Sequence, residues 1–127
     1  MGRGNDVGLI RRAVRKITTS EQELDAAELR EDVVDELGGT PVADCRDREP
    51  VCVAGQIRAV TLRPVGGVPA LEAELYDGDD TVSLVFLGRR NIPGIEPGRM
   101  IVAHGRLRRE DSRALIYNPR YELRPAG

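Results

Sequence analysis

The segment 68–88, VPALEAELYDGDDTVSLVFLG, constrains the fold of this chain more than any other stretch. Apolar and other residues alternate in each half, and this period of two predicts two strands that each turn one face to a core. The predicted core positions are Leu71, Ala73, Leu75, Val82, Leu84 and Phe86. The alternate positions, predicted to face solvent, are Glu72, Glu74, Tyr76, Ser83, Val85 and Leu87. Residues 77–80, Asp-Gly-Asp-Asp, favour a tight turn, so the segment predicts a β-hairpin.

The composition predicts one small domain with an aliphatic core. The chain has 127 residues, of which 40% are hydrophobic and only 3% aromatic. Its formal net charge of −2 argues against the strongly basic profile of an avid nucleic-acid binder. The charge is uneven, because residues 1–49 carry a net −4 and residues 50–127 a net +2. The predicted β-rich part is therefore mildly basic, and the acidic excess precedes it.

Two short amphipathic helices are predicted within residues 1–39, before the β-rich part. The first covers residues 7–17 and surrounds an apolar stripe with basic side chains. The second is strongly acidic; it begins at Ser20, where Glu23 completes a capping box, and ends at Gly38-Gly39. Packing on the domain is the expected role of the basic helix, and contact with an acidic partner, phosphates or a membrane surface is the alternative. The complementary charges also allow pairing of the helices or self-association.

Residues 40–127 show the pattern of a five-stranded barrel. The predicted strands are residues 51–62, the two halves of the hairpin, residues 100–108 and residues 113–123. Gly55 suggests a bulge or bend that lets the first strand serve both sides of a barrel, and Pro119 interrupts the fifth. The widest irregular segment, residues 87–99, falls between the third and fourth strands. This arrangement predicts a mainly β protein, an OB-fold Greek-key barrel preceded by a helical segment, with an SH3-like barrel as the competitor.

Several short segments resemble OB folds that bind nucleic acid. They are VAGQIR (53–58), LYDG (75–78), VF (85–86), EPGR (96–99) and HGRL (104–107). Their general pattern is similar to the anticodon-binding domains of aminoacyl-tRNA synthetases and to the wedge domain of the RecG helicase. Longer segments, ADCRDREPVCVAGQIRAVTLRP, LGRRNIPGIEPGR and NPRYELRP, look like small stand-alone OB proteins of actinobacteria. The resemblance covers about residues 20–125 and implies nucleic-acid binding without a defined reaction.

Arginines gather near the loops that hold ligands in this fold. The ligand is expected across the second and third strands, between the loops 63–68 and 109–113. Guanidinium groups suit this role because their planar forks bind phosphate oxygens and stack on bases. The predicted nucleic-acid-binding residues are Arg58, Arg63, Tyr76, Arg89, Arg90, Arg106, Arg108, Arg109 and Arg113. The competing interpretation is that these arginines are solvated or paired with nearby acids.

Two features of the expected ligand face predict weak binding. Glu72 and Glu74 share that face with Tyr76, and carboxylates repel phosphates, although they can accept hydrogen bonds from base amino groups. Stacking aromatics are scarce, since Tyr117 and Tyr121 lie near the closing strand.

The predicted function is therefore weak, salt-sensitive binding of single-stranded or structured DNA or RNA. A protein-interaction module or oligomerising scaffold is the alternative, and an oligosaccharide ligand fits less well because it too needs stacking aromatics.

No motif predicts an enzyme, a cofactor or a metal site. His104 with Cys45 and Cys52 gives only three candidate ligands, without Cys-x-x-Cys spacing. Residues 77–80 begin like a calcium loop but lack its glycine and its closing Glu, and no phosphate-binding glycine motif occurs. Both cysteines are expected to be reduced thiols. Without an apolar run of membrane-spanning length or a secretion signal, the expected location is the cytoplasm.

Overall fold

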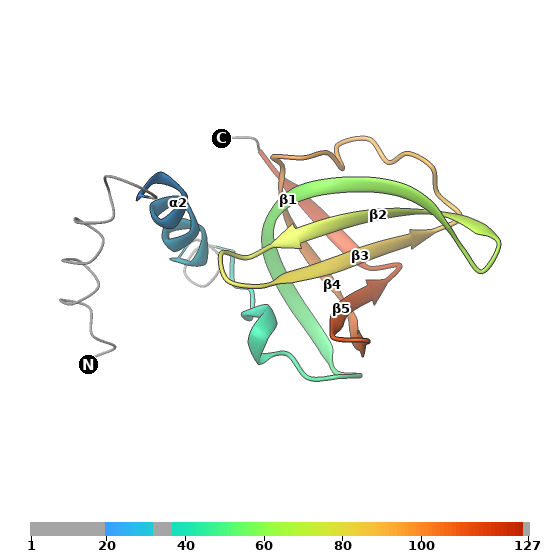
Figure 1. The fold of residues 1–127 in the computed structure, drawn as a ribbon, viewed down its shortest axis with the longest axis horizontal. Coiled ribbons are helices and arrows are strands. Elements are labelled where there is room, and N and C mark those ends of the chain that lie inside the picture. Colours follow the sequence, from blue (N-terminus) through green and yellow to red (C-terminus); the bar gives the residue numbers. More distant parts are fainter. Residues whose placement is uncertain (1–19, 32–36, 126–127) are drawn as a thin grey trace.

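The computed structural model describes residues 20–31 and 37–125, and within them one β-sheet closes on itself (Figure 1). Its elements are α2 (Ser20–Glu31), the 3-10 turn η2 (Val42–Asp44), β1 (Pro50–Val65), β2 (Val68–Tyr76), β3 (Thr81–Leu87), β4 (Met100–Glu110), β5 (Arg113–Tyr117) and β6 (Arg120–Arg124). None of the helices in these described ranges is long and apolar enough to cross a membrane.

Five of the strands form a ring in the order β1-β2-β3-β5-β4-β1. The long strand β1 pairs antiparallel with β4 through its first half and with β2 through its second half. A parallel pairing of residues 83–85 on β3 with residues 115–117 on β5 closes the ring. After a break at Asn118 and Pro119, β6 continues along β4, so the predicted fifth strand is β5 and β6. This is the strand order of an OB fold, and the prediction of a mainly β, five-stranded OB barrel is confirmed.

The predicted hairpin is β2 and β3, and its alternation sets the core. All six predicted core positions lie in the main hydrophobic cluster inside the barrel. The prediction that Val85 faces solvent is wrong, because Ala70 and Leu115 cover it on the outer face and leave it 1% exposed. Part of the outer face of the barrel is therefore apolar. Between β3 and β4 the chain is an irregular loop, as predicted, and its Ile92 and Ile95 are buried.

The strand β1 serves both sides of the barrel, but its bulge does not lie at Gly55. The register with β2 shifts between Ile57 and Ala59, which places the bulge at Arg58. Gly55 is required for a different reason. A Cβ atom there would collide with the backbone carbonyl oxygen of Tyr76, so the absence of a side chain lets β2 approach β1 at the point where β1 changes partners.

The helix α2 begins at Ser20, as predicted, and lies beside the β2–β3 turn (Figure 1). Its Leu29 belongs to a small apolar cluster on the outer face of the barrel, and its Arg30 donates a hydrogen bond to the carbonyl oxygen of Gly78 at 2.6 Å. The predicted first helix, the capping-box side chains of Ser20 and Glu23, and residues 32–36 lie outside the described part. The division of the chain between residues 39 and 40 stays a prediction.

A buried carboxylate, Asp77, joins the hairpin turn to the segment that precedes the barrel. Its Oδ1 accepts hydrogen bonds from the backbone N–H groups of Asp79 at 3.0 Å and Asp80 at 2.9 Å. Its Oδ2 accepts a third from the N–H of Val42 at 2.8 Å, and the side chain is 3% exposed. One carboxylate thus satisfies three backbone donors, which stabilises the turn and positions η2 at the end of the barrel.

We expect Asp77→Ala to lower the free energy of unfolding by about 2–4 kcal/mol, because buried donors left without an acceptor carry a desolvation penalty. Urea denaturation followed by circular dichroism measures the change. The matched control is Asp79→Ala, at an exposed position of the same turn, which should alter stability by less than about 0.5 kcal/mol. Equal losses in the two variants would contradict the role of Asp77.

Candidate nucleic-acid interface

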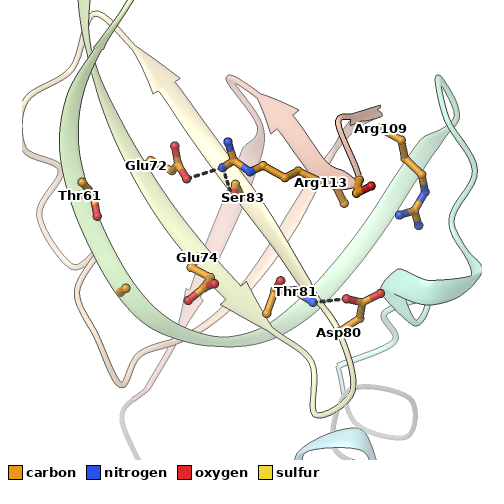
Figure 2. Close-up of a pocket in the computed structure, with 11 residues that line it drawn as sticks. Thr61, Glu72, Glu74, Asp80, Thr81, Ser83, Arg109 and Arg113 are labelled. Atoms are coloured by element: carbon orange, nitrogen blue, oxygen red, sulfur yellow. Dashed lines mark hydrogen bonds and ion pairs between the residues drawn. The ribbon is translucent and has the colours of Figure 1, made fainter.

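A groove with a volume of about 420 Å³ crosses the outer face of the barrel (Figure 2). Side chains from five strands line it, among them Thr61 of β1, Glu72 and Glu74 of β2, Ser83 of β3, Arg109 of β4 and Arg113 of β5. This is the face that the sequence predicts for a ligand, across the second and third strands. Its lining is polar and contains both signs of charge, so it is not the continuous basic groove of a strong nucleic-acid binder.

Within this groove Glu72 holds two arginines. The Nη2 atom of Arg63 lies 2.7 Å from Oε1 of Glu72, and Nη2 of Arg113 donates to Oε2 at 2.7 Å. The same Arg113 nitrogen donates to Oγ of Ser83 at 3.0 Å (Figure 2). The Arg63 contact is an ion pair without hydrogen-bond geometry, so the buried Oε1 atom accepts no hydrogen bond. The Glu72 side chain is 15% exposed and the two arginine side chains are 45% and 44% exposed, which leaves both guanidinium groups accessible.

The three residues of this cluster come from separate parts of the predicted ligand site. Arg63 lies on β1 just before the β1–β2 turn, and Arg113 begins β5 just after the β4–β5 turn. The carboxylate of Glu72 therefore joins the two loops that hold ligands in an OB fold. The cluster carries a net charge of one unit positive, so the predicted repulsion of phosphate by Glu72 is compensated. Glu74 is different, because it has no ion-pair or hydrogen-bond partner within residues 20–31 and 37–125.

Arg109 also borders the groove, but its guanidinium group points away from Glu72 and towards η2 (Figure 2). Its Nη2 donates to the carbonyl oxygens of Val42 and Cys45, both at 2.9 Å, and its Nε donates to that of Cys45 at 3.3 Å. Its backbone N–H donates to Oδ1 of Asp47 at 2.9 Å. These bonds attach the segment around η2 to β4. We assign Arg109 this supporting role and leave it out of the interface.

We expect Arg109→Ala to lower the free energy of unfolding by about 1–3 kcal/mol, because two part-buried carbonyl oxygens lose their donor. Chemical denaturation measures this loss, and Arg89→Ala, in an exposed loop, is the charge-matched control. An Arg109→Ala protein as stable as the control, yet impaired in oligonucleotide binding, would instead support the phosphate contact predicted from the sequence.

Tyr76 and Arg58 form a separate pair beside α2, outside the groove. The guanidinium carbon of Arg58 lies 3.9 Å from the centroid of the Tyr76 ring, a cation–π contact. The Tyr76 hydroxyl donates to the carbonyl oxygen of Gly78 at 3.0 Å, and the ring packs against the cluster that contains Leu29. Tyr76 points to the outer face of β2, as predicted, but this end of the strand lies against α2. Tyr76 is therefore occupied by the chain itself and is not placed to stack on a ligand in the groove.

The remaining predicted arginines are dispersed. Arg89 and Arg90 lie in the exposed loop after β3. Arg106 donates to the carbonyl oxygen of Arg48 at 2.6 Å. Arg108 lies opposite Leu115 in the β4–β5 pairing and 3.7 Å from Glu110. Of the nine predicted residues, the structure thus joins Arg63 and Arg113 through one shared partner.

Tyr117 is a candidate that was not among the predicted site residues. It pairs with Val85 at the closure of the barrel and packs, half-buried, on the outer-face cluster that contains Ala70 and Leu115. Arg113 and Tyr117 are four residues apart on one strand, so they share its outer face at a separation of about 13 Å. That even spacing is the sequence signal that could have identified it. The outer face therefore offers an aromatic ring in line with the arginine cluster.

The two cysteines are free and fit a structural role. Burial raises the pKa of both thiols, and at Cys45 the nearby Arg109 acts in the opposite direction. A raised pKa keeps a thiol protonated near neutral pH, which makes it a poor nucleophile. Among the described residues, no group of three or more His, Cys, Asp and Glu side chains is arranged to hold a metal ion.

The fold and the groove define an OB-fold protein with a ligand face of mixed charge. No protein-family model and no curated protein sequence matches the chain. Among solved structures the chain is similar to one described as "Structure of RecG bound to three-way DNA junction", with a TM-score of 0.49 and 20% sequence identity. The match covers 76% of this chain but only 16% of that one. At this distance the likeness carries no argument about function.

Proposed function

We propose that this protein is not an enzyme and that it binds a short single-stranded segment of DNA or RNA across the groove. The supporting observation is the cluster of Arg63, Glu72 and Arg113, in which two accessible guanidinium groups from the two ligand loops meet at the middle of the OB face. Each arginine uses only Nη2 in its contacts with Glu72 and Ser83, which leaves further donors for phosphate oxygens.

The apolar part of the outer face complements this charged part. Ala70, Val85 and Leu115 are buried and support Tyr117, whose half-buried ring is an aromatic group on this face that can stack on a base. Phosphates would then lie at the arginine cluster and at least one base on the tyrosine. Because few cations face the groove and Glu74 and Asp80 oppose phosphate, the binding is weak, and its salt dependence is shallow because it scales with the number of phosphates contacted.

Fluorescence polarisation tests this function by titration with labelled single-stranded DNA and RNA. Oligonucleotides of about 16 nucleotides are long enough to cover an OB-fold site. We expect measurable binding at low salt, with a slope of log affinity against log salt of about −1.4 if two phosphates are contacted. Arg63→Ala/Arg113→Ala should weaken binding about tenfold or more and flatten that slope. The control Arg89→Ala/Arg120→Ala removes the same charge from exposed positions outside the groove.

The variant Glu72→Gln distinguishes a binding role of the arginine cluster from a structural role, because it removes the carboxylate that holds both arginines. If they contact phosphate, affinity should rise and the salt dependence should steepen. If the cluster serves only the fold, Glu72→Gln should leave affinity unchanged while lowering stability. The absence of binding to either nucleic acid at low salt would overturn the proposal.

A protein-interaction role is the second candidate, and the end of the β1–β2 hairpin supports it. The exposed large hydrophobic residues of the described chain are Leu62 at 50%, Val68 at 43% and Leu87 at 37%. Val68 begins β2, and Leu87 pairs with Ala70 close to it. Leu62 pairs with Leu71 and therefore lies on the other face of the hairpin, where it lines a recess of about 350 Å³ with Pro64 and Pro69. Exposed apolar surface of this kind is typical of contact with another protein or a second copy.

Light scattering of the whole chain over a range of concentrations tests self-association through this surface. We expect the average mass to rise with concentration, because association hides the exposed leucines. The variant Leu62→Ser/Leu87→Ser should return the mass to that of a monomer, whereas Thr61→Ser, at an exposed neighbouring position, should not. A wild-type chain that stays monomeric throughout would argue against an oligomerising scaffold.

A further inference from the structure

Glu74 is a carboxylate in the groove that the protein itself leaves without a partner. It lies on β2, opposite Ser83 of β3 and Ala59 of β1, and its half-buried side chain lines the groove (Figure 2). Glu72, two residues earlier on the same face, is held by two arginines. In the described part of the chain no cation or N–H group plays that role for Glu74.

The surroundings of Glu74 offer acceptors and hydroxyl groups instead of cations. Asp80 borders the same part of the groove, and its Oδ1 accepts a hydrogen bond from the N–H of Thr81 at 2.9 Å. The nearest guanidinium groups are already directed elsewhere, those of Arg63 and Arg113 to Glu72 and that of Arg109 to backbone carbonyls. The groove is therefore polarised: Glu72 holds two guanidinium groups, of which that of Arg113 also reaches Ser83 opposite Glu74, whereas no cation of the described residues contacts Glu74 itself.

This polarity decides which part of a nucleotide fits where. An ionised carboxylate only accepts hydrogen bonds and repels phosphate, so the phosphate must lie at the Glu72 end. The exocyclic amino group of a base is a neutral donor that matches Glu74, as Glu and Asp accept from N4 of cytosine in duplex recognition. Thymine and uracil present a carbonyl oxygen at that position, which would leave two acceptors facing each other.

We propose that Glu74 determines base specificity in this groove and selects bases that carry an exocyclic amino group, cytosine foremost, over thymine and uracil. The inference rests on the nucleic-acid binding proposed above. Glu72 and Glu74 are about 7 Å apart along β2, so a phosphate held by the arginines and a base edge at Glu74 can belong to neighbouring parts of one strand. Glu74 weakens the overall affinity for nucleic acid, but it is then the residue that distinguishes cytosine from thymine and uracil.

Competition between oligo(dC) and oligo(dT) of equal length tests this inference, because both are pyrimidines and differ little in stacking. Measured by polarisation at one low salt concentration and mildly alkaline pH, oligo(dC) should bind the wild-type chain about tenfold more tightly. In Glu74→Gln the ratio should fall to about one, because an amide both donates and accepts. The affinity for oligo(dT) should rise in that variant, since a repelling charge is lost. Glu96→Gln, in the exposed β3–β4 loop, is the charge-matched control and should keep the wild-type ratio.

The outcomes separate the two proposals. If neither oligonucleotide binds the wild-type chain at low salt, nucleic-acid binding itself fails and the inference fails with it. If both bind with equal affinity, or if Glu74→Gln leaves the ratio unchanged, the role of Glu74 is overturned while nucleic-acid binding stands. The ratio of the oligo(dC) and oligo(dT) affinities of the wild-type chain is informative by itself, so the test does not depend on the folding of the variant.

Discussion

The short parallel contact between β3 and β5 is the constraint on which the rest of this structure depends. It joins residues 83–85 to residues 115–117 and is extended by Asn118, whose N–H donates to the Val85 carbonyl at 2.7 Å. The Asn118 side chain in turn accepts a hydrogen bond from the N–H of Leu87 at 2.9 Å. This contact closes the barrel and brings Arg113 to Glu72. It also places Tyr117 on the apolar part of the outer face, so the candidate interface exists only in the closed barrel.

Two charged residues near this interface serve the fold. Asp77 accepts three backbone N–H bonds, and Arg109 donates to two backbone carbonyl oxygens. Both reach the segment around η2, a 3-10 turn that lies outside the sheet. Buried backbone polar groups need hydrogen bonds, and in such a segment side chains supply them. The number of charged residues near a ligand loop is thus a poor guide to the charge available for binding.

The ligand face combines attraction and repulsion at close range. Around Glu72 the two guanidinium groups leave a small positive excess, and at Glu74 no cation of the described residues compensates the negative charge. Such a surface gives little affinity but orients a polar ligand, because phosphate and base edge prefer different ends of the groove. Modest binding with base discrimination is what the proposed function and the inference about Glu74 together expect of such a surface.

The fold could be predicted from the sequence because its signals are local. The alternation in residues 68–88, the turn at residues 77–80 and the glycines of the long strands depend on neighbours along the chain, and they were enough to indicate an OB barrel. The groove lies on the outer face of β2 and β3, where the sequence predicts a ligand, but the partners of single residues on that face were not predicted. Arg113 and Glu72 are 41 residues apart, and only barrel closure brings them into contact. Tyr76 faces outward from β2 as predicted, yet it lies under Arg58 beside α2, while the pairing of β5 with β3 places Tyr117 on the outer-face cluster of Ala70, Val85 and Leu115. Periodicity determines which face a side chain occupies, but its partner there is decided by the tertiary structure, because that partner comes from a distant strand.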